Sequence, residues 1–435
     1  MSKCLLKWIG VFYLVVFVCV TPATGAVSSV ARPRRRTTYK NILVSINIVD
    51  RNGLSETICS KEKLKKYLSV NFLDPQPYQK VLRIYKNQSG ENAYLLTGYH
   101  PNGQIKQYLE GLNNRALGTY KEWFSNGQLK IHAKVVGGVA DLNPAAEAGW
   151  LFDGTTEAFD EDGNCIAQIP YEKGSLEGIA VYFHPNGNVW KEVPYQKNSI
   201  HGTFNIYLSD NRLLQETQFR NGKKHGLSLR YHSPDILAHK ENYIDDRLIH
   251  GSYFQQDGTL LSEIIEGNGT KINFGKTGVA SEEEYRSGNQ HGQVSIFDNS
   301  GCRITRMFRI ENNLKTGEEV FYHSDSSQPQ LLITREHGII QGPIKTWYEN
   351  GNLESCRQMS CNKKNGLATV YYSNGQIMMV EEYENDLLIK GEYYKPGDKQ
   401  CCSKVEKGNG IATLFTKNGA VNQKIIYQDG KPLLD

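Results

Sequence analysis

The sequence contains few apolar residues for its length. Only 39% of its 435 residues are hydrophobic, and the mean hydropathy is −0.51. A chain of this composition lacks the material for a thick globular core. Outside the first 26 residues no apolar run is long enough for a membrane-spanning helix, which needs about 20 such residues.

Motifs for common hydrolytic chemistry are also missing. The sequence contains neither GxSxG nor HExxH, so a hydrolase site would have to be assembled from scattered residues. Glu282, Glu283 and Glu284 lie together in a charged run, where solvated carboxylates are expected rather than an acid/base pair. We therefore predict no enzyme activity and no bound cofactor.

The main body of the chain lacks an excess of basic charge. Seven of the 50 basic residues lie in residues 1–40, which contain no acid, so the remainder carries 43 basic and 46 acidic residues. Nucleic-acid binders need a basic footprint. This balance argues against a nucleic-acid partner.

The cysteines do not form the pair of CxxC motifs that is typical of structural zinc sites. Beyond residue 26 the chain has an odd number of them: Cys59, Cys165, Cys302, Cys356, Cys361, Cys401 and Cys402. They cannot all pair within one chain. Buried free thiols and an intermolecular disulfide both remain open, and no metal site is predicted.

The N-terminal residues are typical of a secretory signal peptide. Lys3 and Lys7 precede an apolar run over residues 8–20, and small residues follow at 23–26. This pattern predicts a signal peptide at 1–26, a basic flexible leader at 27–40, and export to the periplasm, the cell envelope or the medium. An uncleaved inner-membrane anchor is the alternative, because positive charge after such a run favours the cytoplasmic side. The charge in question, which could also contact an anionic surface, comes from Arg32, Arg34, Arg35 and Arg36.

A repeated unit occupies most of the remaining chain. Each unit opens with a glycine and continues with a strand-like run, a turn and a second run. The opening glycines are Gly178, Gly202, Gly226, Gly251, Gly269, Gly292, Gly317, Gly342, Gly366, Gly391 and Gly410. Their spacing is close to 24 residues with two shorter members, which is typical of a tandem array.

Asn-Gly or Asp-Gly pairs separate the two runs of many units, for example at 102–103, 186–187 and 350–351. They predict two-residue hairpin turns of type I′, in which both central residues have positive φ. Aromatic pairs precede these turns at 123–124, 182–183, 321–322, 347–348 and 371–372. Because neighbours on a strand point to opposite faces, we expect one ring to stack along the array and the other to be available to a partner.

Residues 195–202 (YQKNSIHG), 219–226 (FRNGKKHG) and 285–292 (YRSGNQHG) resemble the bacterial MORN-repeat variant family, which includes the YwqK-type antitoxins. The resemblance covers roughly residues 94–430. It implies tandem hairpins in an elongated sheet with a shallow groove, used in related proteins for protein or lipid contact. The expected fold is all-β: a meander of antiparallel hairpin repeats over 91–435 with a small N-terminal α+β cap over 41–90.

Two segments depart from the repeat. In the cap we expect a strand at 42–49, a turn at Asn52-Gly53 and a short helix over 61–68 capped by Ser60. An irregular insertion near 131–160 contains an Ala-rich stretch with a short helix. Such insertions often lie on a functional face, so its Asp141 and Trp150 are candidate binding residues.

Other motifs are expected to be structural. His201, His225, His250 and His291 precede glycines, but equivalent residues of successive hairpins should be roughly 10 Å apart, too far to share one metal ion. Residues 269–277 (GTKINFGKT) imitate a phosphate-binding loop, yet five residues separate the glycines instead of four and no helix pattern follows. We expect a strand at 272–274.

These observations favour an exported, non-catalytic scaffold that binds a protein or envelope partner through a long sheet surface. Aromatic rings provide rigid contact area, and Tyr182, Trp347 and Tyr371 are the preferred candidates. One alternative is a cytoplasmic or membrane-anchored protein resembling antitoxins or immunity proteins, which requires that residues 1–26 are retained. The other is an enzyme acting on envelope polymers, which requires a cleft with converging carboxylates.

Overall fold

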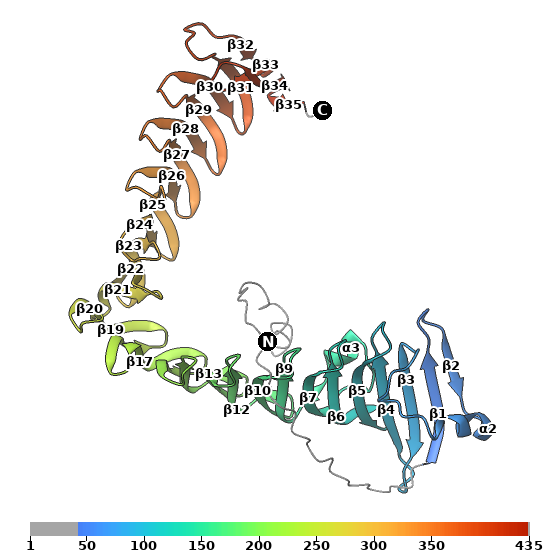
Figure 1. Ribbon diagram of the computed structural model, residues 1–435. Helices are drawn as coiled ribbons and strands as arrows, with labels where there is room; N and C mark the ends of the chain where they lie inside the picture. Colours follow the sequence, from blue (N-terminus) through green and yellow to red (C-terminus); the bar gives the residue numbers. More distant parts are fainter. Residues whose placement is uncertain (1–41, 434–435) are drawn as a thin grey trace, which may run out of the picture. The chain divides into compact units, whose positions relative to one another are not determined.

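The computed structural model describes residues 42–433, which consist almost entirely of antiparallel β-strands (Figure 1). The chain divides after Gly226, within β17 (Lys223–Ser233), into two units that we describe separately. The predicted signal peptide and basic leader lie outside the described residues. Among residues 42–433, no helix has the length and apolar character needed to cross a membrane.

The first unit begins with a small α+β segment. Its elements are β1 (Ile42–Val49), β2 (Ser55–Ile58), α2 (Lys61–Leu64), the 3-10 helix η1 (Lys65–Tyr67) and β3 (Lys80–Lys86). β1 pairs with β2 on one side and β3 on the other. The Ser60 hydroxyl accepts a hydrogen bond from the Lys63 backbone N–H at 3.4 Å. The predicted strand and capped helix are confirmed, although the α-helical part is shorter than expected.

From β3 the first unit continues as a meander in which each of the longer strands pairs with the next longer strand in chain order. Its further elements are β4 (Asn92–Tyr99), β5 (Ile105–Leu112), β6 (Arg115–Trp123), β7 (Leu129–Gly137), α3 (Pro144–Glu147), β8 (Leu151–Phe152), β9 (Gly154–Phe159), β10 (Cys165–Glu172), β11 (Ser175–Leu176), β12 (Gly178–Phe183), β13 (Val189–Gln196), β14 (Ser199–Ile200), β15 (Gly202–Tyr207) and β16 (Leu213–Arg220).

The second unit is a meander of the same kind, with consecutive strands paired from β18 to β35. Its strands are β18 (Ile236–Ile244), β19 (Arg247–Phe254), β20 (Leu260–Ile265), β21 (Asn268–Phe274), β22 (Val279–Arg286), β23 (Asn289–Phe297), β24 (Ile304–Glu311), β25 (Leu314–Tyr322), β26 (Pro329–Glu336), β27 (Ile339–Trp347), β28 (Leu353–Ser360), β29 (Lys363–Tyr371), β30 (Ile377–Glu384), β31 (Leu387–Tyr393), β32 (Ser403–Glu406), β33 (Asn409–Phe415), β34 (Val421–Gln428) and β35 (Lys431–Pro432). The predicted all-β array of tandem hairpins is confirmed. β21 also confirms the strand expected at 272–274.

The two ends of the hairpins carry different turns, and the predicted turn type is wrong at one of them. At the end that carries the Asn-Gly pairs, which we call the turn edge, His184 and Asn188 close a longer turn through two backbone hydrogen bonds, from His184 N–H to Asn188 O and from Gly187 N–H to His184 O. Gly187 has φ +84°, whereas Asn186 stays outside the positive-φ region. This is a three-residue hairpin loop that ends in a glycine bulge.

Type I′ turns are found at the opposite end, which we call the loop edge. There both central residues have positive φ, as at Lys197 (+48°) and Asn198 (+66°) or at Cys361 (+50°) and Asn362 (+66°). Asn-Gly is compatible with both turn types. The loop length, meaning the number of residues between the paired strand ends, decides whether a type I′ turn or a three-residue loop forms. The Asn-Gly dipeptide alone does not specify that length.

One face of the second unit carries an acidic side chain in many of its repeats. Residues paired directly across an antiparallel ladder share a face, and following the register from strand to strand places Glu241, Glu283, Glu319 and Glu381 on the same side. We call this side the glutamate face. Several of its polar side chains are buried, whereas Leu367 on the opposite face is 56% exposed.

The hydrophobic core of the second unit is concentrated in two clusters. One surrounds Tyr253 and the other surrounds Tyr393, and both rings are fully buried. The first unit contains three clusters, of which the N-terminal one includes Ile46, Phe72 and Val81. The described residues therefore form several small hydrophobic clusters and no single thick core, as the low apolar content predicts.

The seven cysteines of the described residues are all free thiols. Cys59, Cys302, Cys361 and Cys402 are exposed, and the other three are half-buried. Of the two possibilities left open by the sequence, the buried thiol does not apply to any of them.

Candidate functional site

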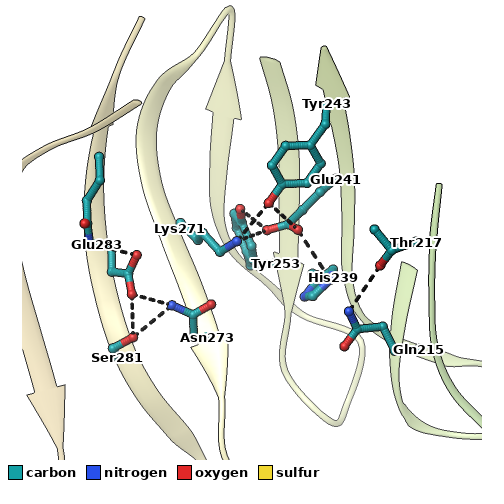
Figure 2. Close-up of polar contacts among 11 residues, drawn as sticks. Gln215, Thr217, His239, Glu241, Tyr243, Tyr253, Lys271, Asn273, Ser281 and Glu283 are labelled. Carbon is teal, nitrogen blue, oxygen red and sulfur yellow. Dashed lines mark hydrogen bonds and ion pairs between the residues drawn. The ribbon is translucent and has the colours of Figure 1, made fainter. Parts of the chain in front are cut away.

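The most deeply buried group of ionisable side chains lies on the glutamate face of β18, β19 and β21. Figure 2 shows Lys271, Tyr243 and Tyr253 converging on the Glu241 carboxylate. Oε1 of Glu241 accepts hydrogen bonds from the Tyr253 hydroxyl at 2.9 Å and from Lys271 Nζ at 2.9 Å, and Oε2 accepts one from the Tyr243 hydroxyl at 2.9 Å. Nε2 of His239 lies 3.5 Å from Oε2.

The electrostatics of this cluster favour a fixed charge pair. Burial alone would raise the pKa of Glu241, but the charges of Lys271 and His239 and the hydrogen bonds lower it to about 2. The pKa of Tyr253 is raised by burial and by the neighbouring carboxylate. Glu241 therefore remains ionised and the tyrosine remains protonated over the ordinary pH range, so neither is suited to exchange protons with a substrate.

A second copy of this arrangement in the same unit indicates a structural role. Glu381 accepts hydrogen bonds from Tyr383 at 3.0 Å and from Tyr393 at 2.8 Å, and it is paired with Gly391 as Glu241 is with Gly251. A Cβ atom on Gly391 would lie 2.6 Å from the Tyr393 hydroxyl oxygen, and one on Gly251 would lie 2.8 Å from that of Tyr253. Glycine leaves space for the ring at both sites.

The copies differ in their cations. In the second cluster Met379 and Ala412 stand where the first has His239 and Lys271, as the matching strand registers show. The carboxylate with two tyrosine donors is therefore the common element. An ion pair found in only one of two otherwise similar cores is not the signature of a reaction centre shared by the repeats.

Glu319 is a further saturated carboxylate on the same face. Oε1 accepts hydrogen bonds from Arg306 Nε at 2.9 Å and Lys315 Nζ at 2.6 Å, and Oε2 accepts one from Arg335 Nε at 2.9 Å. Burial would raise the pKa of Glu319, but these three cations lower it to about 2. The Arg306 guanidinium also lies over the ring of Phe321, 4.7 Å from its centroid.

Residues 42–433 contain no cluster of three or more His, Cys, Asp or Glu side chains arranged to hold a metal ion. Two of the histidines that precede glycines have side-chain neighbours: His201 Nδ1 lies 3.3 Å from Asn221 Oδ1, and His291 Nε2 lies 3.5 Å from Arg286 Nη1.

An open groove at the turn edge of β25–β28 has the features of a binding site. It has a volume of about 800 Å³ and is lined by Phe321, His323, Gln330, Leu331, Thr346, Trp347, Tyr348, Glu349, Asn350, Glu354 and Ser373. Three of these are aromatic rings, and two are glutamates. Binding pockets of proteins combine apolar and aromatic walls with a few polar groups in this way.

A recurring contact between successive repeats holds the wall of this groove. In several repeats the side chain that opens the turn donates a hydrogen bond to the backbone carbonyl just before the next turn, as in Tyr348 to Tyr371 O at 2.7 Å and Tyr372 to Tyr394 O at 2.8 Å. We call this contact the turn latch. Histidine Nε2 makes it from His100, His184, His232 and His323 to the carbonyls of Trp123, Tyr207, Phe254 and Trp347.

Two of the three preferred aromatic candidates lie at the turn edge of the second unit. Trp347 is half-buried and lines the groove, and its carbonyl accepts the latch from His323 at 3.1 Å. Tyr371 is half-buried on the neighbouring repeat, and its carbonyl accepts the latch from Tyr348. In these two pairs the hydroxyl of the second ring, Tyr348 or Tyr372, therefore bonds to the next repeat.

Tyr182, the third candidate, lies in the first unit. Lys191 Nζ lies over its ring at 4.3 Å and over that of Trp190 at 4.5 Å. Burial lowers the pKa of Lys191. Tyr182 thus belongs to a cationic aromatic patch on the first unit.

The two candidates from the insertion are engaged within the fold. Trp150 is 7% exposed, donates a hydrogen bond from Nε1 to Val139 O at 2.9 Å and packs against Tyr120 with ring centroids 4.9 Å apart. Asp141 pairs with Lys80 Nζ at 2.7 Å. Partial burial opposes this charge, but the bond to Lys80 lowers the pKa of Asp141 overall.

The insertion therefore covers part of the first unit's sheet. α3 begins after Asn143, whose side chain accepts a hydrogen bond from Ala146 N–H at 2.9 Å, and Glu147 Oε1 accepts one from Gln107 Nε2 at 2.8 Å. Together with Trp150, these contacts fix the insertion against β5 and β6. Neither Asp141 nor Trp150 presents an uncommitted polar group or an open ring.

The sequence did not single out the carboxylates of the groove or the turn latch. Glu349 and Glu354 flank an Asn-Gly turn, where charged residues are ordinary. A usable signal for the latch was the His or Tyr that recurs two residues before the turn's Asn, as at His184 and Tyr348. The candidate anionic contact through Arg32, Arg34, Arg35 and Arg36 falls outside the described residues.

Comparison with known families agrees with the repeat pattern. The MORN repeat variant family matches residues 116–134, 176–197, 340–359 and 364–385. These four segments lie in both units, and two of them contain strands that border the groove. The family resemblance drawn from the sequence is confirmed for these repeats. No curated protein matches the chain.

Proposed function

We propose that this protein is an exported, non-catalytic scaffold that binds a protein or envelope partner through the turn-edge groove of β25–β28. The proposal rests on one observation: aromatic rings and polar groups line an open groove that residues 42–433 leave unfilled. The MORN-variant matches at residues 340–359 and 364–385, which contain groove residues, are consistent with a binding surface built on a stacked array.

The two carboxylates of the groove differ from the buried carboxylates of the glutamate face in their bonding partners. Glu241 and Glu319 are both paired with cations of their own unit, and Glu241 also accepts two tyrosine hydrogen bonds. Glu349 and Glu354 have no ion-pair or hydrogen-bond partner among residues 42–433. Polar groups that are left open beside aromatic rings are what a partner recognises.

Site-specific photo-crosslinking in cells tests the proposed surface. A photoreactive residue at position 330, which lines the groove, is compared with one at position 367, which is exposed on the opposite face. We expect one specific adduct from position 330 and none from position 367, identified by mass spectrometry. The same adduct from both positions, or none from position 330, would contradict a groove-directed scaffold.

The compartment is tested by the mature N-terminus. Intact-mass analysis after cell fractionation should show cleavage near Gly25 or Ala26, with the protein recovered outside the cytoplasm. Full-length protein retained in the cytoplasm or at the inner membrane would overturn the export proposal and favour the antitoxin-like alternative.

A further inference from the structure

The charge of the groove indicates which kind of partner it accepts. Two of its lining residues, Glu349 and Glu354, are acidic, and its lining includes no lysine or arginine. Glu354 lies close enough to Tyr348 for its charge to contribute to raising the pKa of that hydroxyl, after burial. An acidic pocket with aromatic walls repels anions and attracts cations.

Within the described residues the two carboxylates are not neutralised by the protein itself. Every strongly buried glutamate of this face is satisfied, by cations at Glu319 or by tyrosine hydroxyls at Glu381. The groove lining therefore carries a net negative charge, and its two carboxylates make no ion pair that stabilises the described fold. A bound cation would gain both the ion pairs and the ring contacts.

The same unit contains an intramolecular example of this recognition. Arg306 lies 4.7 Å from the centroid of Phe321 while it donates hydrogen bonds to Glu319. Phe321 is itself a wall of the groove. On β24, the strand next to the groove, this sheet thus holds a guanidinium between an aromatic ring and a carboxylate.

We infer that the groove binds an extended, arginine-containing peptide segment of a partner protein. A planar guanidinium stacks on an aromatic ring and binds carboxylates with two parallel hydrogen bonds, which a lysine ammonium cannot do. The volume of about 800 Å³ exceeds that of one side chain, so it accommodates a stretch of chain. This inference rests on the proposed function and adds the chemistry of the partner.

The chain supplies a convenient probe. A synthetic peptide of residues 31–38 (ARPRRRTT) contains four arginines. It is titrated into the full-length protein by calorimetry, beside the same peptide with every arginine replaced by glutamine. We expect saturable binding of the first peptide and binding weaker by at least about tenfold for the second. The titration is repeated with the protein variant in which Arg32, Arg34, Arg35 and Arg36 are glutamine, which removes self-competition.

Two charge-matched variants locate the site. Glu349→Gln with Glu354→Gln removes two negative charges from the groove. Glu318→Gln with Glu382→Gln removes the same charge from exposed positions on the opposite face. We expect the first variant to weaken binding by about tenfold or more and the second by less than about threefold.

The outcomes separate this inference from the proposed function. Equal weakening by both double variants would reduce the effect to net charge and overturn the inference. So would equal affinity for the arginine and glutamine peptides. If position 330 still crosslinks a partner in either case, the scaffold function stands and only the partner chemistry is wrong. If it crosslinks nothing, the proposed function fails independently.

Discussion

At the scale of single residues, the second unit satisfies buried carboxylates in three ways. Glu241 has a lysine, a histidine and two tyrosines, Glu319 has three cations, and Glu381 has two tyrosines alone. A buried charge is tolerated only when it is paired and hydrogen-bonded. The number of donors differs, but no carboxylate of this group is left with fewer than two.

Removing the lysine of the first cluster tests this requirement. Lys271→Met leaves the Glu241 carboxylate buried without its cation, and we expect a loss of about 3–5 kcal/mol in the free energy of unfolding. Lys390→Met, which removes an exposed lysine 3.5 Å from Glu392, should cost about 1 kcal/mol or less. Urea denaturation followed by circular dichroism measures both. A similar small loss in the two variants would show that the ion pair contributes little.

The lowered carboxyl pKa values predict how stability depends on pH. The pKa of Glu241 and that of Glu319 are each lowered from 4.5 to about 2 in the folded protein. Their contribution to stability is therefore complete above pH 4.5 and is lost as the pH falls toward 2. We expect the melting temperature to fall most steeply in that window. Glu319→Gln should make the decline shallower, and an unchanged profile would contradict the assignment.

At the scale of elements, the turn latch joins several hairpins to the next one. The donor is the residue that opens the turn, and the acceptor is the carbonyl before the following turn. These hairpins are therefore held both by their strand pairing and by a side chain at the turn edge. Isolated hairpins are only marginally stable, so contacts between hairpins carry much of the stability.

A tyrosine-to-phenylalanine pair measures the latch. Tyr348→Phe removes one hydrogen bond to Tyr371 O, and the loss should be about 1 kcal/mol. Tyr322→Phe is the control, because that hydroxyl has no hydrogen-bond partner among residues 42–433, and it should be close to neutral. Amide exchange of β29 should accelerate in the first variant only. If both variants behave alike, the latch does not stabilise the array.

The sequence predicted the existence of these hairpins better than their turns. Period-2 patterns and regular glycines placed the strands, because strand alternation is a local property. The type I′ prediction at Asn186-Gly187 failed, since the same dipeptide serves a longer loop. The sequence pointed to the groove only through Trp347 and Tyr371. Glu349 and Glu354 were not predicted, because they become groove residues only when three successive turns pack side by side.

At the scale of the whole molecule, each unit contains small hydrophobic clusters separated by strands with fewer buried side chains. In the second unit the clusters around Tyr253 and Tyr393 contain the fully buried rings, and the groove of β25–β28 lies between them in sequence. Repeat arrays derive stability from nearest-neighbour interfaces, so local stability should follow this distribution. The position of the cores was not predictable, since Tyr residues also occur in repeats outside these clusters, as at Tyr322 and Tyr348.

Hydrogen exchange measures this distribution. Amides of β19–β21 and β30–β33 should exchange more slowly than those of β25–β28, because opening the clusters exposes more buried surface. Peptide-resolved exchange of the intact chain compares the three regions in one experiment. Uniform protection across β18–β34 would indicate a single cooperative unit and contradict the expectation.

Three neighbouring turns at the loop edge close a ring of backbone hydrogen bonds twice in the second unit. Leu248 N–H donates to Gly288 O, Gly288 N–H to Gly267 O, and Gly267 N–H to Ile249 O. The same circuit connects residues 388, 389, 408 and 430. The Glu-Tyr-Tyr cores recur at matching positions, so the ring of turns and the buried carboxylate together form one structural motif that is longer than a single repeat. The motif forms with Lys271 beside one carboxylate and with Ala412 at the matching position of the other, so the closed ring of turns does not depend on the ion pair.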